Sequence, residues 1–225
     1  VSFLTAYGKE NLENKVRVIS PYGIIDIELF KDTPLHRANF IYLVKQKYFD
    51  NTFLHRVVPN FIIQAGSSDL KSTFKKRAII GNNYRIPYEK GNGRTHSYGT
   101  VSGAKEYREN PDKKTSPFEF FIYLGPKTSN THLNGNYTIY GKVIKGMDVV
   151  ERLSKLPSDD EDWPLNNIYI KAEIIYNDYY TIKICISGSR TSKLHKSSSA
   201  CLCYTTYAKY ANSKIRRRVK YFNFR

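Results

Sequence analysis

Cysteine is nearly missing from this chain, because only three of the 225 residues are cysteine and none precedes residue 185. Cys185, Cys201 and Cys203 are odd in number, which excludes a closed disulfide framework. The Cys-x-Cys spacing at 201–203 also differs from the Cys-x-x-Cys spacing of common zinc sites. We interpret the three thiols as incidental, and they indicate nothing about the redox compartment.

Acidic side chains are nearly missing from the last segment. From Tyr176 to Arg225 there are eleven Lys and Arg and one acid, Asp178, whereas the segment 1–175 holds 25 basic and 19 acidic side chains. The net charge of +16 therefore divides into +10 for the last segment and +6 for the rest. Because the segment 1–175 shows neither a basic face nor a nucleic-acid motif, we expect no specific nucleic-acid binding there.

Long apolar runs are missing too. No stretch of about 18 consecutive apolar residues occurs, which argues against a membrane-spanning helix. The chain begins at Val1, without a methionine and without a charged and then apolar leader. This start indicates either a chain from which a signal peptide was removed or a fragment of a longer one.

The pattern that is present consists of short β-type segments with one helix near the start and one near the end. Alternating apolar residues on both sides of Pro21-Tyr22-Gly23 predict a hairpin over 15–30. Thr33 as N-cap and Pro34 at the first helical position predict a helix over 34–46. The remaining predicted elements are strands at 52–58, 61–65, 98–104, 118–124, 137–144 and 168–176, a helix at 146–156, and a long irregular excursion at 67–98.

About eight strands with two helices favour an antiparallel sheet closed into a barrel, with a sandwich as the alternative. We divide the chain into an N-terminal extension (1–14), a main domain (15–176) and a basic, Ser- and Tyr-rich, poorly ordered tail (177–225). The tail is interpreted as a disordered extension, with a basic arm for an anionic polymer or lipid and a frame-shifted end as alternatives.

Four sequence blocks occur in an order and spacing that resemble the signature of one family. They are FLHRVVPNFIIQAG (53–66), GTVSGA (99–104), SPFEFFIYLG (116–125) and HLNGNYTIYGKVIKGMDVVERL (132–153). Together they resemble the cyclophilin family of peptidyl-prolyl cis-trans isomerases over residues 15–176. The sequences of residues 105–126 and 160–175 further resemble those of bacterial members, particularly members from Bacteroidetes-type organisms.

The resemblance implies a mainly β fold, a closed eight-stranded antiparallel β-barrel capped by two α-helices, here followed by the basic C-terminal tail. It places the active groove on the outer surface of the barrel. It also implies an isomerase that needs no covalent intermediate, metal or cofactor, since only the partial double bond before a proline has to be weakened. A proline-peptide binding module with little turnover remains the alternative.

The same resemblance assigns the site residues. Arg56 matches the catalytic arginine, whose permanently charged donors can hydrogen-bond to the prolyl nitrogen as it pyramidalises, and Gln64 matches the glutamine that orients it. The proline socket corresponds to Phe61, Ile62, Phe121 and Leu133, and the adjoining wall to Ala104 and Lys105. His55, Glu119, His132 and Tyr137 complete the predicted substrate-binding set.

Several of these positions depart from the best-known relatives. His132 stands in place of a tryptophan, which predicts weakened cyclosporin binding because the indole N–H and its large face are missing. Tyr137 replaces a histidine, Ile62 a methionine, and Lys105 an asparagine. Glu119 replaces a glutamine, and it is expected either to form an ion pair with Arg56 that competes with substrate or to face solvent at the groove rim.

The expected partners follow from the same resemblance. The expected partners are unfolded or proline-containing polypeptides, and the protein is expected to be a monomer. For His55, strand alternation places the side chain opposite to that of Arg56, which favours a packing or hydrogen-bonding role over proton transfer. A bacterial periplasm or cell-envelope location is favoured over the cytoplasm.

Overall fold

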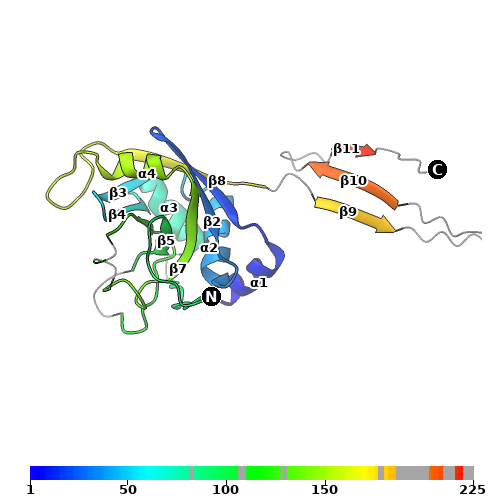
Figure 1. Ribbon diagram of the computed structural model, residues 1–225, viewed down its shortest axis with the longest axis horizontal. Helices are drawn as coiled ribbons and strands as arrows, with labels where there is room; N and C mark the ends of the chain where they lie inside the picture. The colour runs from blue at the N-terminus through cyan, green and yellow to red at the C-terminus, as the bar shows by residue number, and fades with distance from the viewer. Residues whose placement is uncertain are drawn as a thin grey trace, which may run out of the picture. The chain divides into compact units, whose positions relative to one another are not determined.

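The structure is a computed structural model that describes residues 1–81, 84–105, 110–126, 128 and 131–176, together with three strands farther along the chain. The chain divides into two compact units, Val1–Ile175 and Tyr176–Arg225 (Figure 1). In the second unit, β9 (Tyr180–Cys185), β10 (Cys203–Lys209) and β11 (Arg216–Val219) form an antiparallel sheet in the order β11-β10-β9. The rest of the predicted tail, and with it the prediction of poor order, lies outside the described residues.

Eight antiparallel strands of the first unit close into a barrel, in the order β1-β2-β7-β5-β6-β4-β3-β8. This confirms the predicted fold class and excludes the sandwich. The strands are β1 (Lys15–Ser20), β2 (Gly23–Leu29), β3 (Thr52–Val58), β4 (Ile62–Ser67), β5 (Thr100–Gly103), β6 (Phe120–Tyr123), β7 (Ile139–Lys145) and β8 (Ile168–Ile174).

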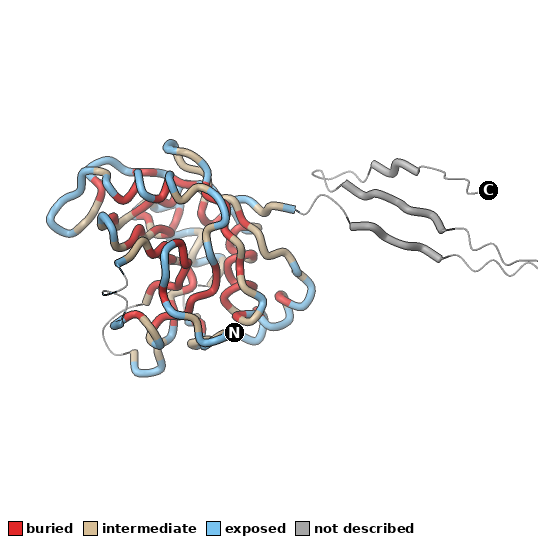
Figure 2. Tube along the Cα trace, viewed as in Figure 1, coloured by how far each residue is buried: buried red, intermediate tan, exposed pale blue. Residues whose placement is uncertain are grey.

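The barrel interior is filled by alternate residues of the strands, and Figure 2 shows this buried centre in red. Apolar side chains of α2 (Pro34–Lys45) and α4 (Met147–Ser154) belong to the same buried cluster. In α4 the inward residues Val149, Val150 and Leu153 recur at helical spacing. The two predicted helices therefore cap the barrel by adding to its core.

The start of α2 differs from its predicted cap. Thr33 occupies the N-cap position, but its hydroxyl donates to the Phe30 carbonyl oxygen (3.3 Å) and caps no helical N–H. The free N–H groups of Leu35 and His36 instead donate to the Glu89 carboxylate, at 3.0 and 2.9 Å. A carboxylate at a helix N-terminus is favourable because the helix dipole is positive there. Residue type at position 33 alone could not reveal a cap supplied by a side chain so far downstream.

Two further helices were not predicted. The excursion at 67–98, predicted to be irregular, contains α3 (Lys71–Ile80), in which only Thr73 is buried. A helix that buries one side chain shows no apolar periodicity, so the sequence pattern gave no signal for it. Within the predicted N-terminal extension, α1 (Ser2–Glu10) packs on α2, where Arg37 donates to the Gly8 carbonyl oxygen at 2.9 Å.

Two bulges interrupt the pairing of β3 with β4. Leu54 pairs with Ala65 and Arg56 with Gln64, which leaves His55 as an extra residue on β3. Phe53 pairs with Ser67, which leaves Gly66 as an extra residue on β4, with φ of +104°. The Gly66 carbonyl oxygen accepts a hydrogen bond from the buried Tyr48 hydroxyl (2.8 Å).

Candidate active site

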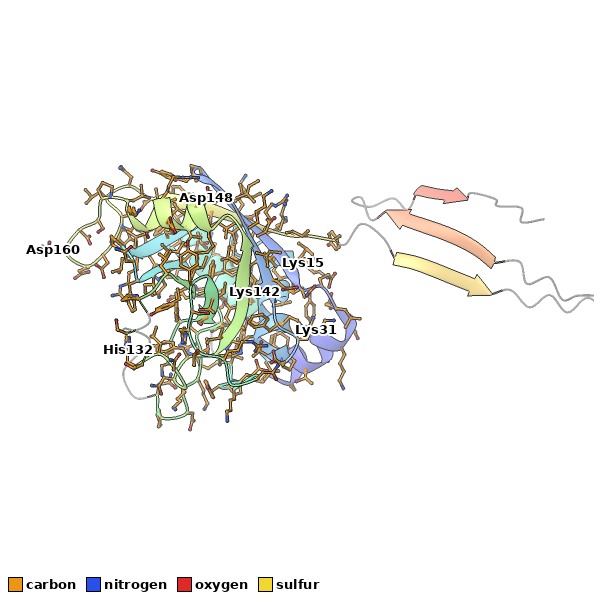
Figure 3. The ribbon with its side chains drawn as sticks, viewed as in Figure 1. Lys15, Lys31, His132, Lys142, Asp148 and Asp160 are labelled. Carbon is orange, nitrogen blue, oxygen red and sulfur yellow. The ribbon has the colours of Figure 1, made fainter. Side chains whose placement is uncertain are left out.

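A pocket of about 240 Å³ lies against β3, β4 and β6, and ten of the twelve predicted site residues line it. They are Arg56, Phe61, Ile62, Gln64, Ala104, Lys105, Phe121, His132, Leu133 and Tyr137. Figure 3 shows His132 in the turn after β6, at the surface of the barrel unit. His55 and Glu119 do not line the pocket.

The pocket is on the outer face of the barrel, because alternate residues of β4 and β6 belong to two separate clusters. Ile63 and Ile122 lie in the interior cluster, whereas Ile62 and Phe121 lie in a second cluster with Tyr123, Leu133 and Tyr137. Period-two alternation along a strand sends neighbouring side chains to opposite faces. The outer cluster supplies the apolar part of the pocket.

Three site residues form a row across neighbouring strands. Arg56 of β3 is paired with Gln64 of β4, and Gln64 is paired with Phe121 of β6. The bulge at His55 is what brings Arg56 into this row. Leu54 and Val57 both point into the barrel, and uninterrupted alternation would have sent residue 56 inward with Leu54.

The socket is backed by a histidine that the sequence patterns did not indicate. His96 stacks on Phe121 with ring centroids 5.8 Å apart and an interplanar angle of 11°. Its Nδ1 lies 2.9 Å from Asn134 Oδ1, and its Nε2 lies 3.0 Å from Ser102 Oγ. On the pocket side of Phe121, the Tyr137 ring meets it edge to face at 5.5 Å. Phe121 is therefore packed against two rings, one stacked and one edge to face.

The contacts of Glu119 differ from both expectations, an ion pair with Arg56 and a carboxylate that faces solvent at the groove rim. Arg56 Nε donates to Asp162 Oδ2 (3.0 Å), and Gln64 Nε2 donates to Glu119 Oε2 (3.3 Å). The same Glu119 oxygen lies 3.7 Å from His55 Nε2. Glu119 thus contacts Gln64 and His55, and the carboxylate beside Arg56 comes from Asp162, in a distant part of the chain.

The wall at Ala104 and Lys105 has its own pairing. The Ala104 N–H donates to the Glu119 carbonyl oxygen (3.2 Å), and the Ala104 carbonyl oxygen accepts from the Ser116 N–H (2.8 Å). Lys105 Nζ lies over the Tyr137 ring, 4.6 Å from its centroid. Burial lowers the pKa of Lys105, and the positive charge of Lys113 lowers it further.

The buried histidines make the stability of the fold depend on pH. Burial lowers the pKa of both His55 and His96 below the ordinary value, against the opposing effects of Glu119 and Asn134. In the unfolded chain the two imidazoles bind a proton with the ordinary pKa of about 6.5, whereas in the folded chain protonation requires a lower pH. Their contribution is therefore present above about pH 6.5 and is lost as the pH falls through the folded-state pKa.

We expect the free energy of unfolding to fall between pH 7.5 and pH 5.5, and to fall less in His55→Gln and in His96→Gln than in the wild type. Urea unfolding followed by circular dichroism at the two pH values measures this change. An equal fall in the wild type and both variants would contradict the assignment, whatever the absolute stability of the variants.

Among the residues that the structure describes, no group of three or more His, Cys, Asp or Glu side chains is arranged to hold a metal ion. In the same part of the chain, no helix has both the length and the apolar character needed to cross a bilayer.

Comparisons with known proteins agree on one family. The sequence model described as "Cyclophilin type peptidyl-prolyl cis-trans isomerase/CLD" matches residues 15–174. A peptidyl-prolyl cis-trans isomerase of Acinetobacter baylyi is 37% identical over 142 residues, covering 60% of this chain and 69% of the relative. A peptidyl-prolyl cis-trans isomerase-like 3 protein of Dictyostelium discoideum is 34% identical over 155 residues, covering 68% and 90%.

A solved structure extends the likeness to three dimensions. It is the crystal structure of a cyclophilin-type peptidyl-prolyl cis-trans isomerase of Cryptosporidium parvum in the presence of the dipeptide Ala-Pro. It is 30% identical, with a TM-score of 0.59, and the match covers 72% of this chain and 99% of the other.

Proposed function

The chain belongs to the cyclophilin-type peptidyl-prolyl cis-trans isomerases, and we propose that it accelerates X-Pro rotation in the outer pocket with Arg56 as the catalytic residue. One observation carries the proposal. Arg56, which the bulge in β3 turns outward, lines the same pocket as the apolar side chains of Phe61, Phe121 and Leu133. We expect the proline ring to bind against these apolar side chains, with its amide nitrogen within reach of the Arg56 guanidinium.

The chemistry requires only that the twisted amide be favoured over the planar one. Rotation about the C–N bond meets a barrier of about 18–20 kcal/mol, because resonance gives that bond partial double-bond character. In the twisted state the prolyl nitrogen regains its lone pair, and a guanidinium N–H of Arg56 donates to it. A hydrogen-bond donor that is already oriented toward the group that gains electron density in the transition state is usually a large catalytic contribution in enzymes.

The other polar groups hold the peptide. Gln64 uses one N–H on Glu119, which leaves its second N–H and its carbonyl oxygen for the substrate backbone. Phe61 and His132 stand at the surface side of the pocket, with ring centroids 6.1 Å apart. Proline-containing peptides are the proposed substrates, and the Ala-Pro dipeptide in the Cryptosporidium crystal supports this class.

The proposal is tested by the rate of cis-trans exchange in an X-Pro peptide, measured by NMR exchange spectroscopy with and without the protein. We expect exchange on the millisecond to second scale, against tens to hundreds of seconds for the free peptide. A protein that binds the peptide and leaves its exchange rate unchanged would be a proline-peptide binding module instead. Arg56→Ala measured beside the wild type tests the assigned residue.

Phe61 provides a second prediction. We expect Phe61→Ala to raise KM about tenfold with little change in kcat, because the socket holds the ring in the planar and twisted states alike. The side chain is only half-buried, so the fold should tolerate the change. Initial rates over a range of peptide concentrations separate the two constants. A fall in kcat at unchanged KM would show that Phe61 acts on the twisted state.

Three further proposals concern partners and place. His132 is exposed, and an imidazole provides less contact area than an indole, so we propose weak cyclosporin binding, which titration calorimetry measures.

We propose that the protein is a monomer, which sedimentation equilibrium tests. We also propose a bacterial periplasm or cell-envelope location, and fractionation of cells that express the full-length gene product tests it.

A further inference from the structure

The loop between α4 and β8 holds a carboxylate against the proposed catalytic arginine. Arg56 Nε donates to Asp162 Oδ2 at 3.0 Å, and the two side chains are 42% and 38% exposed. Among the described residues, this carboxylate is the one hydrogen-bond partner of the Arg56 side chain. An ion pair this exposed contributes little to stability, so stability alone gives no reason for the contact.

Hydrogen bonds within the loop fix the backbone on both sides of Asp162. Asp159 Oδ1 accepts hydrogen bonds from the N–H groups of Glu161 (3.0 Å) and Trp163 (2.8 Å), which closes a tight turn. The Asp159 N–H in turn donates to the Trp163 carbonyl oxygen (2.9 Å). The enclosed Asp162 adopts φ of +66°, a left-handed conformation that is uncommon for a non-glycine residue.

The turn is also fastened to the barrel next to Arg56. The Val57 N–H donates to the Asp162 carbonyl oxygen at 2.8 Å, so the loop is hydrogen-bonded to β3 at the residue that follows the arginine. Trp163 packs edge to face on Phe53 of the same strand, with centroids 5.5 Å apart. The backbone and the side chain of Asp162 thus contact consecutive residues of β3.

The contact is made through the nitrogen of Arg56 that is least useful to a substrate. Nε lies inside the guanidinium and carries one hydrogen, whereas the two terminal nitrogens carry two each. Holding Nε fixes the plane of the guanidinium and leaves all four terminal N–H groups for the pocket. A half-exposed arginine without such a partner would spread over several rotamers, and few of them would direct a donor at the prolyl nitrogen.

We propose that Asp162 is a positioning residue for catalysis: it holds the Arg56 guanidinium in the orientation that donates to the prolyl nitrogen. The inference rests on the proposed function, since it assigns Asp162 a role in the work of Arg56. Asp162 does not line the pocket. Its effect therefore appears in kcat, which depends on the twisted state, more than in KM.

The test compares three variants of the full chain in the exchange assay. We expect Asp162→Ala to lower kcat about tenfold with KM changed less than about twofold, and Asp162→Asn to recover most of the loss because its amide oxygen can still accept from Nε. Asp160→Ala is the matched control. It removes the same charge from the same loop, and Figure 3 shows Asp160 at the outer end of that loop. It should leave both constants within about twofold of the wild type.

A spectroscopic measurement separates orientation from general damage. The Nε–H signal of Arg56 in an arginine side-chain 1H–15N spectrum should exchange slowly with water in the wild type and in Asp162→Asn, and rapidly in Asp162→Ala. Unchanged or raised kcat in Asp162→Ala would overturn the proposal, and so would an equal loss in Asp160→Ala. Arg56→Ala distinguishes a failure of the proposed function from a failure of the role of Asp162. If Arg56→Ala keeps wild-type turnover, the proposed function fails. If Arg56→Ala loses turnover and Asp162→Ala does not, only the role of Asp162 fails.

Discussion

Replacing Arg56 with alanine is expected to lower kcat/KM for an X-Pro peptide by about 10²–10³-fold, which corresponds to about 3–4 kcal/mol of transition-state stabilisation. The loss should fall mainly on kcat, because the hydrogen bond to the prolyl nitrogen forms only when the nitrogen regains its lone pair. Exchange rates at saturating peptide measure kcat, and peptide titration of the pocket resonances measures binding. The two together show which step has changed.

Arg56→Lys is the informative companion variant. Lysine keeps the positive charge but has no Nε–H in the position that contacts Asp162 and no planar fork of donors. We expect its kcat to stay within about tenfold of the alanine variant. Near-wild-type turnover in the lysine variant would mean that charge alone suffices and that the geometry of the guanidinium is unimportant.

Replacing Gly66 with alanine is expected to lower the free energy of unfolding by about 3 kcal/mol or more. A Cβ at this position would lie 2.1 Å from the Phe118 carbonyl oxygen, a backbone atom that cannot move aside cheaply. The φ of +104° adds the strain that any side chain incurs in this region. Both effects act on the bulge in the pairing of β3 with β4, so we expect the packing around the pocket to be disturbed as well.

Gly81 provides the control for this prediction. Its φ of +100° is nearly the same, but a Cβ there would meet no atom of the described residues within 4 Å. Gly81→Ala should therefore show the backbone strain alone, about 1–2 kcal/mol. Urea unfolding of both variants measures the difference. Equal losses would show that the contact with Phe118 relaxes freely and that the bulge is not tightly packed.

The sequence patterns predicted the barrel where a pattern is local. The hairpin around Pro21-Tyr22-Gly23 and the helix that begins at Pro34 follow from turn residues and helical spacing, and both lie where they were expected. The choice of a barrel over a sandwich required the family resemblance, because closure depends on the pairing of β8 with β1, which are far apart in the sequence.

The parts of the site that escaped prediction depend on contacts between distant segments. No local pattern joins Asp162 to Arg56, or Glu89 to the start of α2. Glu119 could be recognised as a departure, yet its contacts with Gln64 and His55 depend on the spacing of β4 and β6. A usable signal was present only at 159–163, where an aspartate four positions before a tryptophan is compatible with a side-chain-capped turn.

Because β3 carries one extra, unpaired residue at His55, the face of the barrel on which Arg56 lies depends on this bulge. Before the bulge the even-numbered Leu54 faces the core, and after it the odd-numbered Val57 does, so one residue exchanges the inner and outer sets of positions. If His55 instead took a regular paired position in the strand, alternation would turn Arg56 toward the apolar interior with Leu54 and would send Val57 outward, although every side chain would be chemically intact. One unpaired backbone position, rather than the chemistry of any side chain, thus determines that the arginine of β3 faces the outer pocket.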